Sequence, residues 1–306
     1  MEITRTDIEA AAGRIEGWVR RTPVLEVQEG LVLKLDLLQP TGSFKVRGAF
    51  SLLTSHPEGR QVVAASGGNF GLAVAYAASR LDKTADIFVP STSPDAKIAR
   101  IRALGARVHV IEGFYAEALV ASEEFSRDRE VLTAHAYDDP HVVAGQGTCG
   151  REILAQIPDV DTVVVAVGGA GLIGGIASWV RDDARVIAVE TEGTASLHAA
   201  LAAGRPVTTE VGGVAADSLG SARVGEIGFE AASRWVDQSV LVTDDDVVAA
   251  QRWLWDQCRL IAEPGAATAV AALTSGSYQP GSDEQVCVLV CGANTDPSFV
   301  AVDSSV

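Results

Sequence analysis

The stretch TVVVAVGGAGLIGG occupies residues 162–175, where a β-branched run leads directly into a cluster of glycines. Residues 162–167 are apolar at almost every position, which is typical of a strand buried on both faces of a parallel sheet. The glycines favour a tight loop, and the small apolar residues after them predict a helix. Residues 162–180 carry no charge, but the clustered glycines favour strand, loop and helix over a membrane span.

The same alternation of strand and helix recurs along the chain. Apolar runs predict further strands over residues 31–35, 62–65, 86–89, 107–111, 185–189, 240–242 and 285–290. Ala-rich segments with helical spacing predict helices over residues 71–80, 94–104, 145–157, 244–258 and 265–273. Strands that alternate with helices indicate an α/β fold with mostly parallel sheets.

Composition restricts the class of protein. The 306 residues are enough for about two domains of ordinary size. Lys and Arg number 24 against 40 for Asp and Glu, and the resulting net charge of −16 disfavours nucleic acid and membrane surfaces as partners. The four cysteines are too few and too scattered for a disulfide scaffold, and the first residues contain no apolar signal region. We therefore expect a cytoplasmic protein with reduced thiols.

Two glycine-rich loops follow predicted strands and open predicted helices. The first, residues 66–71, either binds an anion at the helix N-terminus or is a tight turn that needs glycine. The second contains Gly169, Gly171 and Gly174 in the spacing G-x-G-x-x-G, with Glu190 about 20 residues farther on. That spacing is the fingerprint of dinucleotide-binding oxidoreductases, and this segment considered alone favours such a protein.

Only four lysines occur in the chain, so each of them is easy to examine. Lys34 alternates with apolar residues in a predicted strand, and we expect its side chain to point into solvent. Lys45 lies in the segment QPTGSFKVRGA, residues 39–49, among turn-forming residues, small residues and one aromatic ring. It is either an ordinary surface lysine or a partly desolvated amine that forms a Schiff base with an aldehyde cofactor.

The sequence around Lys45, SFKVRGA at residues 43–49, resembles the cofactor-lysine motif of the serine/threonine dehydratases. These are tryptophan synthase β-like, or type II, pyridoxal-phosphate enzymes. Further segments resemble the family in the same order: SGGNFG at 66–71, AGQGT at 144–148 with Glu152, GGAGL at 168–172, a weaker EPGA at 263–266, and CGAN at 291–294. The resemblance spans about residues 20–295, and it implies that the dinucleotide fingerprint is a coincidence, because both kinds of loop bind phosphate.

The resemblance implies pyridoxal 5′-phosphate as the cofactor and a role for each matching residue. Lys45 would carry the cofactor as a Schiff base and then act as the catalytic base at the substrate Cα. Phe44 would pack near the cofactor ring, Asn69 would hydrogen-bond its 3′-oxygen, and Cys291 would face its pyridine nitrogen. The backbone amides expected to bind the phosphate belong to Gly168, Gly169, Ala170, Gly171 and Leu172. The residues expected to bind the substrate carboxylate are Ser66, Gly67 and Asn69.

The resemblance also implies an activity, the β-elimination of a β-hydroxy amino acid such as L-serine or L-threonine to a 2-oxo acid and ammonia. A thiol at Cys291 cannot hold a proton on the pyridine nitrogen as a carboxylate would, which favours prompt elimination over transamination. Related serine racemases carry a serine base where this sequence has Gly67, so dehydration is favoured over racemisation. An amino-acid racemase or a β-replacement enzyme of the same fold is the alternative, and a dinucleotide-binding oxidoreductase is a more remote one.

We expect no bound metal. Cys287 and Cys291 are spaced to share one strand face, but no second pair completes a zinc site. Some relatives bind a divalent cation through a glutamate and an aspartate; Glu190 matches the glutamate, whereas Ser196 replaces the aspartate. Glu190 is therefore only a weak candidate for a metal ligand. In the second glycine loop, Ala170 stands where many relatives have glycine, a change that a methyl group should tolerate.

The resemblance predicts two open-sheet α/β domains of the type II pyridoxal-phosphate fold. The smaller domain would comprise residues 62–138. The larger, cofactor-binding domain would be discontinuous and comprise residues 1–61 and 139–306. The cofactor and an amino-acid substrate would bind in the cleft between the domains, a common location for ligand sites. A homodimer is expected from the same resemblance.

Overall fold

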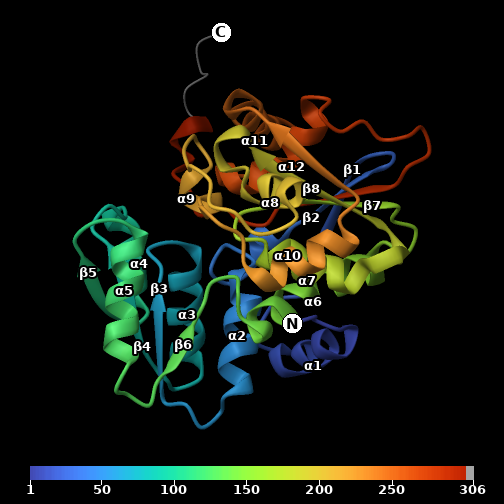
Figure 1. The fold of residues 1–306 in the computed structure, drawn as a ribbon. Coiled ribbons are helices and arrows are strands. Elements are labelled where there is room, and N and C mark those ends of the chain that lie inside the picture. The colour runs from blue at the N-terminus through green and yellow to red at the C-terminus, as the bar shows by residue number, and fades with distance from the viewer. Residues whose placement is uncertain (301–306) are drawn as a thin grey trace.

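Two mostly parallel β-sheets organise the computed structural model, which describes residues 1–300 (Figure 1). The larger sheet has the spatial order β1 (Val24–Gln28), β2 (Leu31–Lys34), β10 (Val286–Leu289), β7 (Thr162–Ala166), β8 (Arg185–Thr191) and β9 (Gln238–Val242). The smaller sheet has the order β5 (Arg107–Ile111), β4 (Thr84–Pro90), β3 (Gln61–Ala65) and β6 (Leu132–Ala134). All paired strands are parallel except β1 and β2, so the predicted α/β class is confirmed.

Helices cover the sheets and connect them. The α-helices are α1 (Arg5–Ile15), α2 (Lys45–Ser55), α3 (Asn69–Arg80), α4 (Asp95–Ala103), α5 (Tyr115–Ser126), α6 (Pro140–Gln156), α7 (Gly171–Val180), α8 (Ser196–Ala203), α9 (Ala216–Leu219), α10 (Glu226–Trp235), α11 (Asp244–Cys258) and α12 (Pro264–Thr274). Short 3₁₀ helices occur at η1 (Asp36–Leu38), η2 (Arg181–Asp183), η3 (Glu192–Thr194) and η4 (Pro297–Val300). The smaller sheet lies with α3, α4 and α5 at one side of the molecule, and α2 packs between α3 and α6 (Figure 1).

The strands predicted from apolar runs are all present, with small shifts at their ends. Residues 162–180 form β7, the glycine loop and α7, as predicted, and among residues 1–300 no helix is long and apolar enough to cross a membrane. The sequence did not reveal β1 and β6. β1 is an edge strand whose residues are partly exposed, and β6 has only three residues, so neither forms a continuous apolar run.

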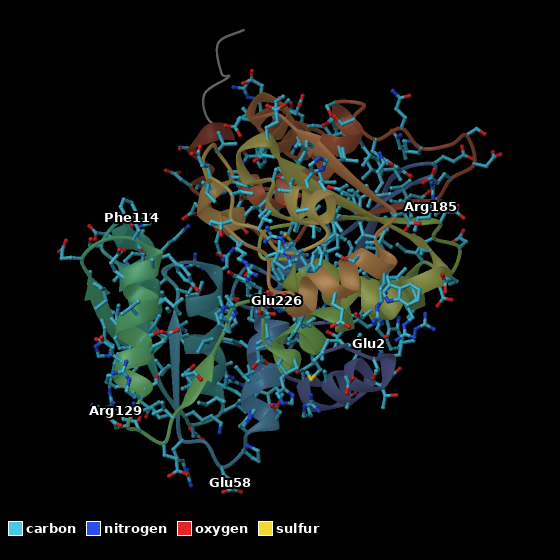
Figure 2. All side chains as sticks on the ribbon, viewed as in Figure 1. Glu2, Glu58, Phe114, Arg129, Arg185 and Glu226 are labelled. Carbon is cyan, nitrogen blue, oxygen red and sulfur yellow. The ribbon has the colours of Figure 1, made fainter. Side chains whose placement is uncertain are left out.

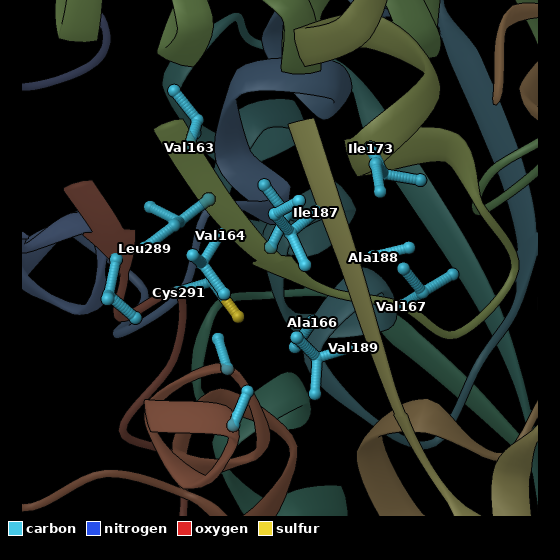
Figure 3. Packing of buried hydrophobic residues seen from close by; sticks show 14 of the residues in the cluster. Val163, Val164, Ala166, Val167, Ile173, Ile187, Ala188, Val189, Leu289 and Cys291 are labelled. Atoms are coloured by element: carbon cyan, nitrogen blue, oxygen red, sulfur yellow. The ribbon is translucent and has the colours of Figure 1, made fainter. Parts of the chain in front are cut away.

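The core of the larger sheet consists of small branched side chains that interdigitate between strands and helices (Figure 3). All five residues of β7 are buried, and Val163 and Val164 have no exposed surface. Ile187 of β8 and Leu289 of β10 pack in the same cluster. Full burial of one such side chain stabilises the fold by roughly 1.5–3 kcal/mol. This packing explains why continuous apolar runs were a good predictor of the central strands.

The common direction of the parallel strands places several loops at the same edges of the two sheets. Residues 66–69 follow β3, residues 168–170 follow β7, and residues 291–294 follow β10. In open α/β sheets, ligands bind outside the carboxyl ends of the strands. The loops singled out from the sequence therefore all lie where such a fold binds ligands.

Lys34 does not point into solvent, so that prediction was wrong. Most charged side chains extend from the surface, as Glu58, Arg129 and Glu226 do (Figure 2). Lys34 is instead fully buried, because β2 lies between β1 and β10 and its face is covered by α6. Its Nζ donates hydrogen bonds to Glu152 Oε2 at 2.7 Å, Gln156 Oε1 at 2.7 Å and the Thr22 carbonyl oxygen at 2.8 Å.

Lys34 belongs to a buried network of paired charges. The Arg47 guanidinium donates to both oxygens of Asp36, at 2.7 and 2.8 Å, and to both oxygens of Glu152, at 2.8 and 2.9 Å. Burial opposes the ionised form of Asp36, but Arg47 and Lys34 outweigh it and lower the Asp36 pKa. The network ties η1, α2 and α6 together directly behind the start of α2.

Candidate active site

Lys45 is the first residue of α2 and is partly buried. Its Nζ donates a hydrogen bond to the Ala136 carbonyl oxygen at 3.1 Å. The amine also lies 5.0 Å from the centre of the Phe44 ring and 5.7 Å from that of Phe70. Burial lowers the Lys45 pKa to about 8, against smaller raising effects of Cys291 and Glu263. A lysine of this kind is neutral often enough near neutral pH to act as a nucleophile or a base.

Backbone pairing brings Cys291 beside the lysine segment. The Phe44 N–H donates to the Cys291 carbonyl oxygen at 2.9 Å, and Ser43 forms an antiparallel bridge with Gly292. The Cys291 side chain is 3% exposed, and burial raises the pKa of its thiol. Cys291 is therefore a neutral thiol beside Lys45.

The glycine loop, residues 168–172, connects β7 to the first turn of α7 and packs against Tyr137. A methyl group built on Gly169 would lie 2.3 Å from Cγ of the Tyr137 ring, so only glycine fits there. Tyr137 directly follows Ala136, whose carbonyl oxygen accepts the hydrogen bond from Lys45, so the glycine loop and the lysine are neighbours. Ala170 has φ of 66°, in the left-handed region where a methyl group costs roughly 1–2 kcal/mol.

The serine–glycine loop, residues 66–69, joins β3 to α3, and its residues are partly buried. The Ser66 Oγ accepts a hydrogen bond from the Gly68 N–H at 3.3 Å. A methyl group on Gly67 would lie 1.9 Å from Ser93 Oγ, so the Ser93 hydroxyl occupies the space of a side chain at position 67. The loop lies near Lys45 because Phe70, which follows it, contacts the amine.

Asn69 is held at both ends of its side-chain amide. Its Nδ2 donates to Glu263 Oε1 at 2.7 Å, and its Oδ1 accepts from Asn294 Nδ2 at 2.7 Å. Glu263 is 3% exposed, and burial raises its pKa to about 7, although the Asn69 hydrogen bond opposes the shift. The structure thus gathers the serine–glycine loop, Lys45, Cys291 and the glycine loop into one site.

Sequence reasoning assigned no contact in this site to four of its residues: Ser93, Tyr137, Glu263 and Asn294. Glu263 and Asn294 stand inside segments that were quoted, EPGA and CGAN, so a signal was present for both. Ser93 and Tyr137 lie outside any quoted motif, and only their packing against Gly67 and Gly169 reveals them.

Glu190 has a structural use that accounts for both of its oxygens. Its Oε1 accepts from the Leu197 N–H and its Oε2 from the His198 N–H, each at 2.7 Å. These are free N–H groups at the start of α8, so the carboxylate caps that helix. No group of three or more metal-ligating side chains occurs among residues 1–300. In a dinucleotide-binding protein, the acidic residue at this spacing hydrogen-bonds a ribose hydroxyl of the ligand. The Glu190 oxygens instead accept hydrogen bonds from backbone N–H groups of this protein.

Comparison with known proteins identifies the family. The family model described as "Pyridoxal-phosphate dependent enzyme" matches residues 15–292, which is most of the chain. The chain belongs to this family. Its cofactor is therefore pyridoxal phosphate, as the resemblance implied, and the dinucleotide fingerprint in the glycine loop is a coincidence, because an anion-binding loop at a helix N-terminus serves either ligand.

Several relatives of this pyridoxal-phosphate enzyme are similar along almost its whole length. An L-threonine ammonia-lyase of Thermotoga maritima is 35% identical over 97% of this chain and 77% of that protein. A phenylserine dehydratase of Ralstonia pickettii is 36% identical over 97% of this chain and 96% of that protein. Among solved structures, the processed form of threonine deaminase isoform 2 from Solanum lycopersicum has a TM-score of 0.87 at 31% identity, covering 97% of this chain and 90% of its own. Maize serine racemase has a TM-score of 0.91 at 26% identity, covering 98% and 96%.

The residues of the site fit pyridoxal phosphate chemically. The amine of Lys45 suits an aldehyde, and the N-terminus of the ten-residue helix α7 suits a phosphate. The buried hydroxyls of Thr41 and Ser43, on the segment that leads to Lys45, have no hydrogen-bond partner in the part of the chain that the structure describes. Such groups are compatible with a polar ligand beside them.

Proposed function

We propose that the chain is a pyridoxal-phosphate dependent dehydratase, an ammonia-lyase, which converts a β-hydroxy amino acid such as L-serine or L-threonine to a 2-oxo acid and ammonia. The observation that carries the proposal is the Lys45 amine, whose pKa of about 8 and position beside the glycine loop suit a cofactor-binding base. Pyridoxal phosphate, when bound, withdraws electrons from the Cα of an amino acid and makes its α-proton acidic. The relatives named L-threonine ammonia-lyase and phenylserine dehydratase support elimination from a β-hydroxy amino acid.

We assign the cofactor-binding roles by position. The backbone amides of residues 168–172 would hold the phosphate at the N-terminus of α7. Phe44 would pack on the cofactor ring, since its own ring lies 5.0 Å from the Lys45 amine. Asn69 would bind the 3′-oxygen, and Cys291 would face the pyridine nitrogen. Each role is supported by the proximity of the residue to Lys45 or to the glycine loop.

Lys45 would remove the α-proton, because it is the basic group at the centre of the site. Ser66, Gly67 and Asn69 would hold the substrate carboxylate at the N-terminus of α3, where backbone N–H groups favour an anion. With the carboxylate fixed on one side and the phosphate on the other, the Cα would lie beside the amine. Positioning of this kind lowers the barrier to proton transfer.

The neutral thiol of Cys291 favours elimination over transamination. Burial raises the pKa of this thiol, so it carries no charge near neutral pH. An uncharged thiol cannot hold a proton on the pyridine nitrogen, and charge that develops at the substrate Cα is stabilised less than it would be opposite a carboxylate. A leaving group on Cβ that departs promptly is then the favoured outcome.

An amino-acid racemase is the second candidate, because maize serine racemase shares the fold over 98% of this chain. Racemisation needs a proton donor on the face of the substrate opposite the lysine. Gly67 has no side chain to serve as that donor, and the hydroxyl nearest to the space of such a side chain is Ser93 Oγ. A β-replacement enzyme of the same fold is a third candidate, and the assay below separates all three.

The test is the release of 2-oxo acid by the purified, cofactor-loaded protein from L-serine, D-serine, L-threonine, threo-3-hydroxyaspartate and phenylserine. We expect release from at least one of them, and the preferred substrate identifies the pocket. Chiral analysis of the remaining amino acid detects racemisation, and added thiol or sulfide nucleophiles detect β-replacement. Protein that binds the cofactor but releases no 2-oxo acid from any of these substrates contradicts the dehydratase proposal.

We further propose that residues 62–138 form the smaller domain and that residues 1–61 and 139–306 form the larger one. The separation of β3 to β6 from the other strands supports this division. We also propose that the protein is a cytoplasmic homodimer, as the family resemblance implies. Light scattering of the purified protein tests the dimer, and limited proteolysis tests the domain boundaries.

A further inference from the structure

The Asn69 amide lies within a chain of hydrogen bonds that runs in one direction, from Arg100 to Glu263. Arg100 Nη1 donates to Asn294 Oδ1 at 2.9 Å, and Asn294 Nδ2 donates to the Thr41 carbonyl oxygen at 2.9 Å and to Asn69 Oδ1 at 2.7 Å. Asn69 Nδ2 then donates to Glu263 Oε1 at 2.7 Å. The chain links α3 and α4, beside the smaller sheet, to the segments that follow β10 and precede α12 beside the larger sheet.

The two ends of this chain determine which way each amide points. A guanidinium only donates, and an ionised carboxylate only accepts. Arg100 therefore fixes the oxygen of Asn294 toward itself, and Glu263 fixes the nitrogen of Asn69 toward itself. One N–H and one lone pair of Asn69 stay available for a ligand, and their positions are set by Glu263 and Asn294 rather than by Asn69 itself.

The backbone around Glu263 and Gly292 holds the Glu263 carboxyl group against the Asn69 amide. Its own N–H donates to the Gly292 carbonyl oxygen at 3.1 Å, one residue from Cys291. A methyl group on Gly292 would lie 2.0 Å from Glu263 Oε1, so the absence of a side chain at position 292 makes room for the carboxylate. Glu263 is 3% exposed, and burying a carboxyl group costs free energy unless its hydrogen bonds are satisfied.

We infer that Glu263 is a positioning residue, which orients the Asn69 amide toward the cofactor bound at Lys45 and acts on the cofactor only through Asn69. This inference rests on the proposed function, because it takes Asn69 as the residue that binds the cofactor's 3′-oxygen. It extends that function by assigning a role to a buried carboxyl group outside the lysine motif and the two glycine-rich loops.

The charges around Glu263 make its effect dependent on pH. Lys45 and Lys97 favour its ionised form, Asp217 disfavours it, and the neighbouring Cys291 is a neutral thiol. Burial is the largest effect and raises the Glu263 pKa to about 7. Below this pH the protonated carboxyl can also donate, so the direction of the Asn69 amide is less strictly imposed. The folded pKa exceeds that of the unfolded chain, so any stability contributed by the protonated form is lost as the pH rises through about 7.

A double-mutant cycle between Glu263→Leu and Asn69→Ala tests the inference on the full-length protein. The readouts are the dissociation constant for pyridoxal phosphate and the visible absorption spectrum of the bound cofactor. We expect E263L alone to weaken cofactor binding by about 10-fold or more and to shift the spectrum. In the N69A background we expect E263L to change the dissociation constant by less than about 2-fold. Equal effects in the two backgrounds, or no spectral shift from E263L, would overturn the inference.

An isosteric variant and a control keep the test independent of folding. E263Q preserves the shape of the side chain but cannot ionise, so we expect it to lose a spectral transition near pH 7 that the wild-type protein shows. A transition that persists unchanged in E263Q contradicts the inference. E284Q is the control, because Glu284 is a partly buried, hydrogen-bonded carboxylate that precedes β10, at the edge of the larger sheet opposite the site. We expect E284Q to leave the spectrum unchanged.

The two proposals fail in distinguishable ways. If the wild-type protein binds pyridoxal phosphate without any cofactor absorbance that depends on Lys45, the proposed function is wrong. If that absorbance is present but the cycle shows no coupling between Glu263 and Asn69, only the inference about Glu263 is wrong.

Discussion

The side chains of Lys34 and Lys45 are both removed from solvent, but only the Lys34 amine is paired with a carboxylate. The Lys34 amine has no exposed surface and meets three acceptors, one of which is the Glu152 carboxylate at 2.7 Å. The Lys45 amine is partly buried and meets one backbone carbonyl oxygen, that of Ala136. Among residues 1–300, no carboxylate forms an ion pair with it.

This difference separates a structural charge from a reactive one. Burial of a charge is costly, and a paired charge recovers part of that cost through its partner. Lys45 lacks such a partner, because its neighbours are the neutral thiol of Cys291 and Glu263, whose own pKa is raised to about 7. The free energy is instead lowered by release of the proton, which brings the Lys45 pKa down to about 8 and makes the amine reactive.

Lys45→Ala removes the reactive amine. We expect 2-oxo acid release to fall by roughly 10⁴-fold or more, because no other amine can replace the base, and the absorbance of the Schiff base between Lys45 and the cofactor to disappear. Steady-state kinetics and absorption spectra check both effects. Lys83→Ala is the control, since within residues 1–300 the Lys83 amine hydrogen-bonds to backbone carbonyl oxygens alone, at the end of the smaller sheet far from the site. Near-normal activity in the Lys45→Ala protein would contradict the proposed mechanism.

Arg47→Met tests the buried charge network to which Lys34 belongs. The substitution leaves Asp36 fully buried without its principal partner, and we expect a loss of about 3–5 kcal/mol in the free energy of unfolding. Urea denaturation followed by circular dichroism measures it. A second substitution, Asp36→Leu, should recover part of the loss by removing the unpaired charge. A loss below about 1 kcal/mol for Arg47→Met would show that the network contributes little.

The pH dependence of amine reactivity compares Lys45 with an ordinary lysine directly. A lowered pKa means that the amine loses its proton at lower pH, so reductive methylation of Lys45 should rise through about pH 8. Labelling of an unperturbed lysine rises only near pH 10.4, and at pH 7 the larger fraction of neutral amine predicts roughly 200-fold faster labelling of Lys45. Peptide mass spectrometry of cofactor-free protein measures the profile, with the urea-denatured chain as control. Identical profiles in the folded and denatured chains contradict the shift.

Lys97→Ala should have the smallest effect. Lys97 of α4 pairs with Asp217 of α9, and their side chains are 20% and 59% exposed. An ion pair so close to solvent contributes about 0.2–1 kcal/mol, because water screens it, and the contribution falls at high salt. Thermal unfolding at low and high salt measures this contribution. A change as large as that of Arg47→Met would remove the distinction between exposed and buried pairs.

The sequence by itself determined the α/β fold, the positions of the central strands and the segments that meet at the site. These features are encoded locally: β7 reads as an apolar run because both of its faces are buried, and a glycine loop must follow where a strand turns tightly into a helix. The lysine motif and the glycine loops were likewise recognisable as short segments.

Only the tertiary structure decided how charged and polar side chains are paired. The sequence around Lys34 predicts an exposed side chain, but α6, more than a hundred positions away, covers it. The position of Glu190 suggested a possible metal ligand, but backbone N–H groups at the start of α8 donate to both of its oxygens. The Asn69 amide meets Glu263 and Asn294 across sequence separations of 194 and 225 residues. Periodicity reports which face of one element is buried, whereas the partner of a buried polar group depends on which distant elements pack against it.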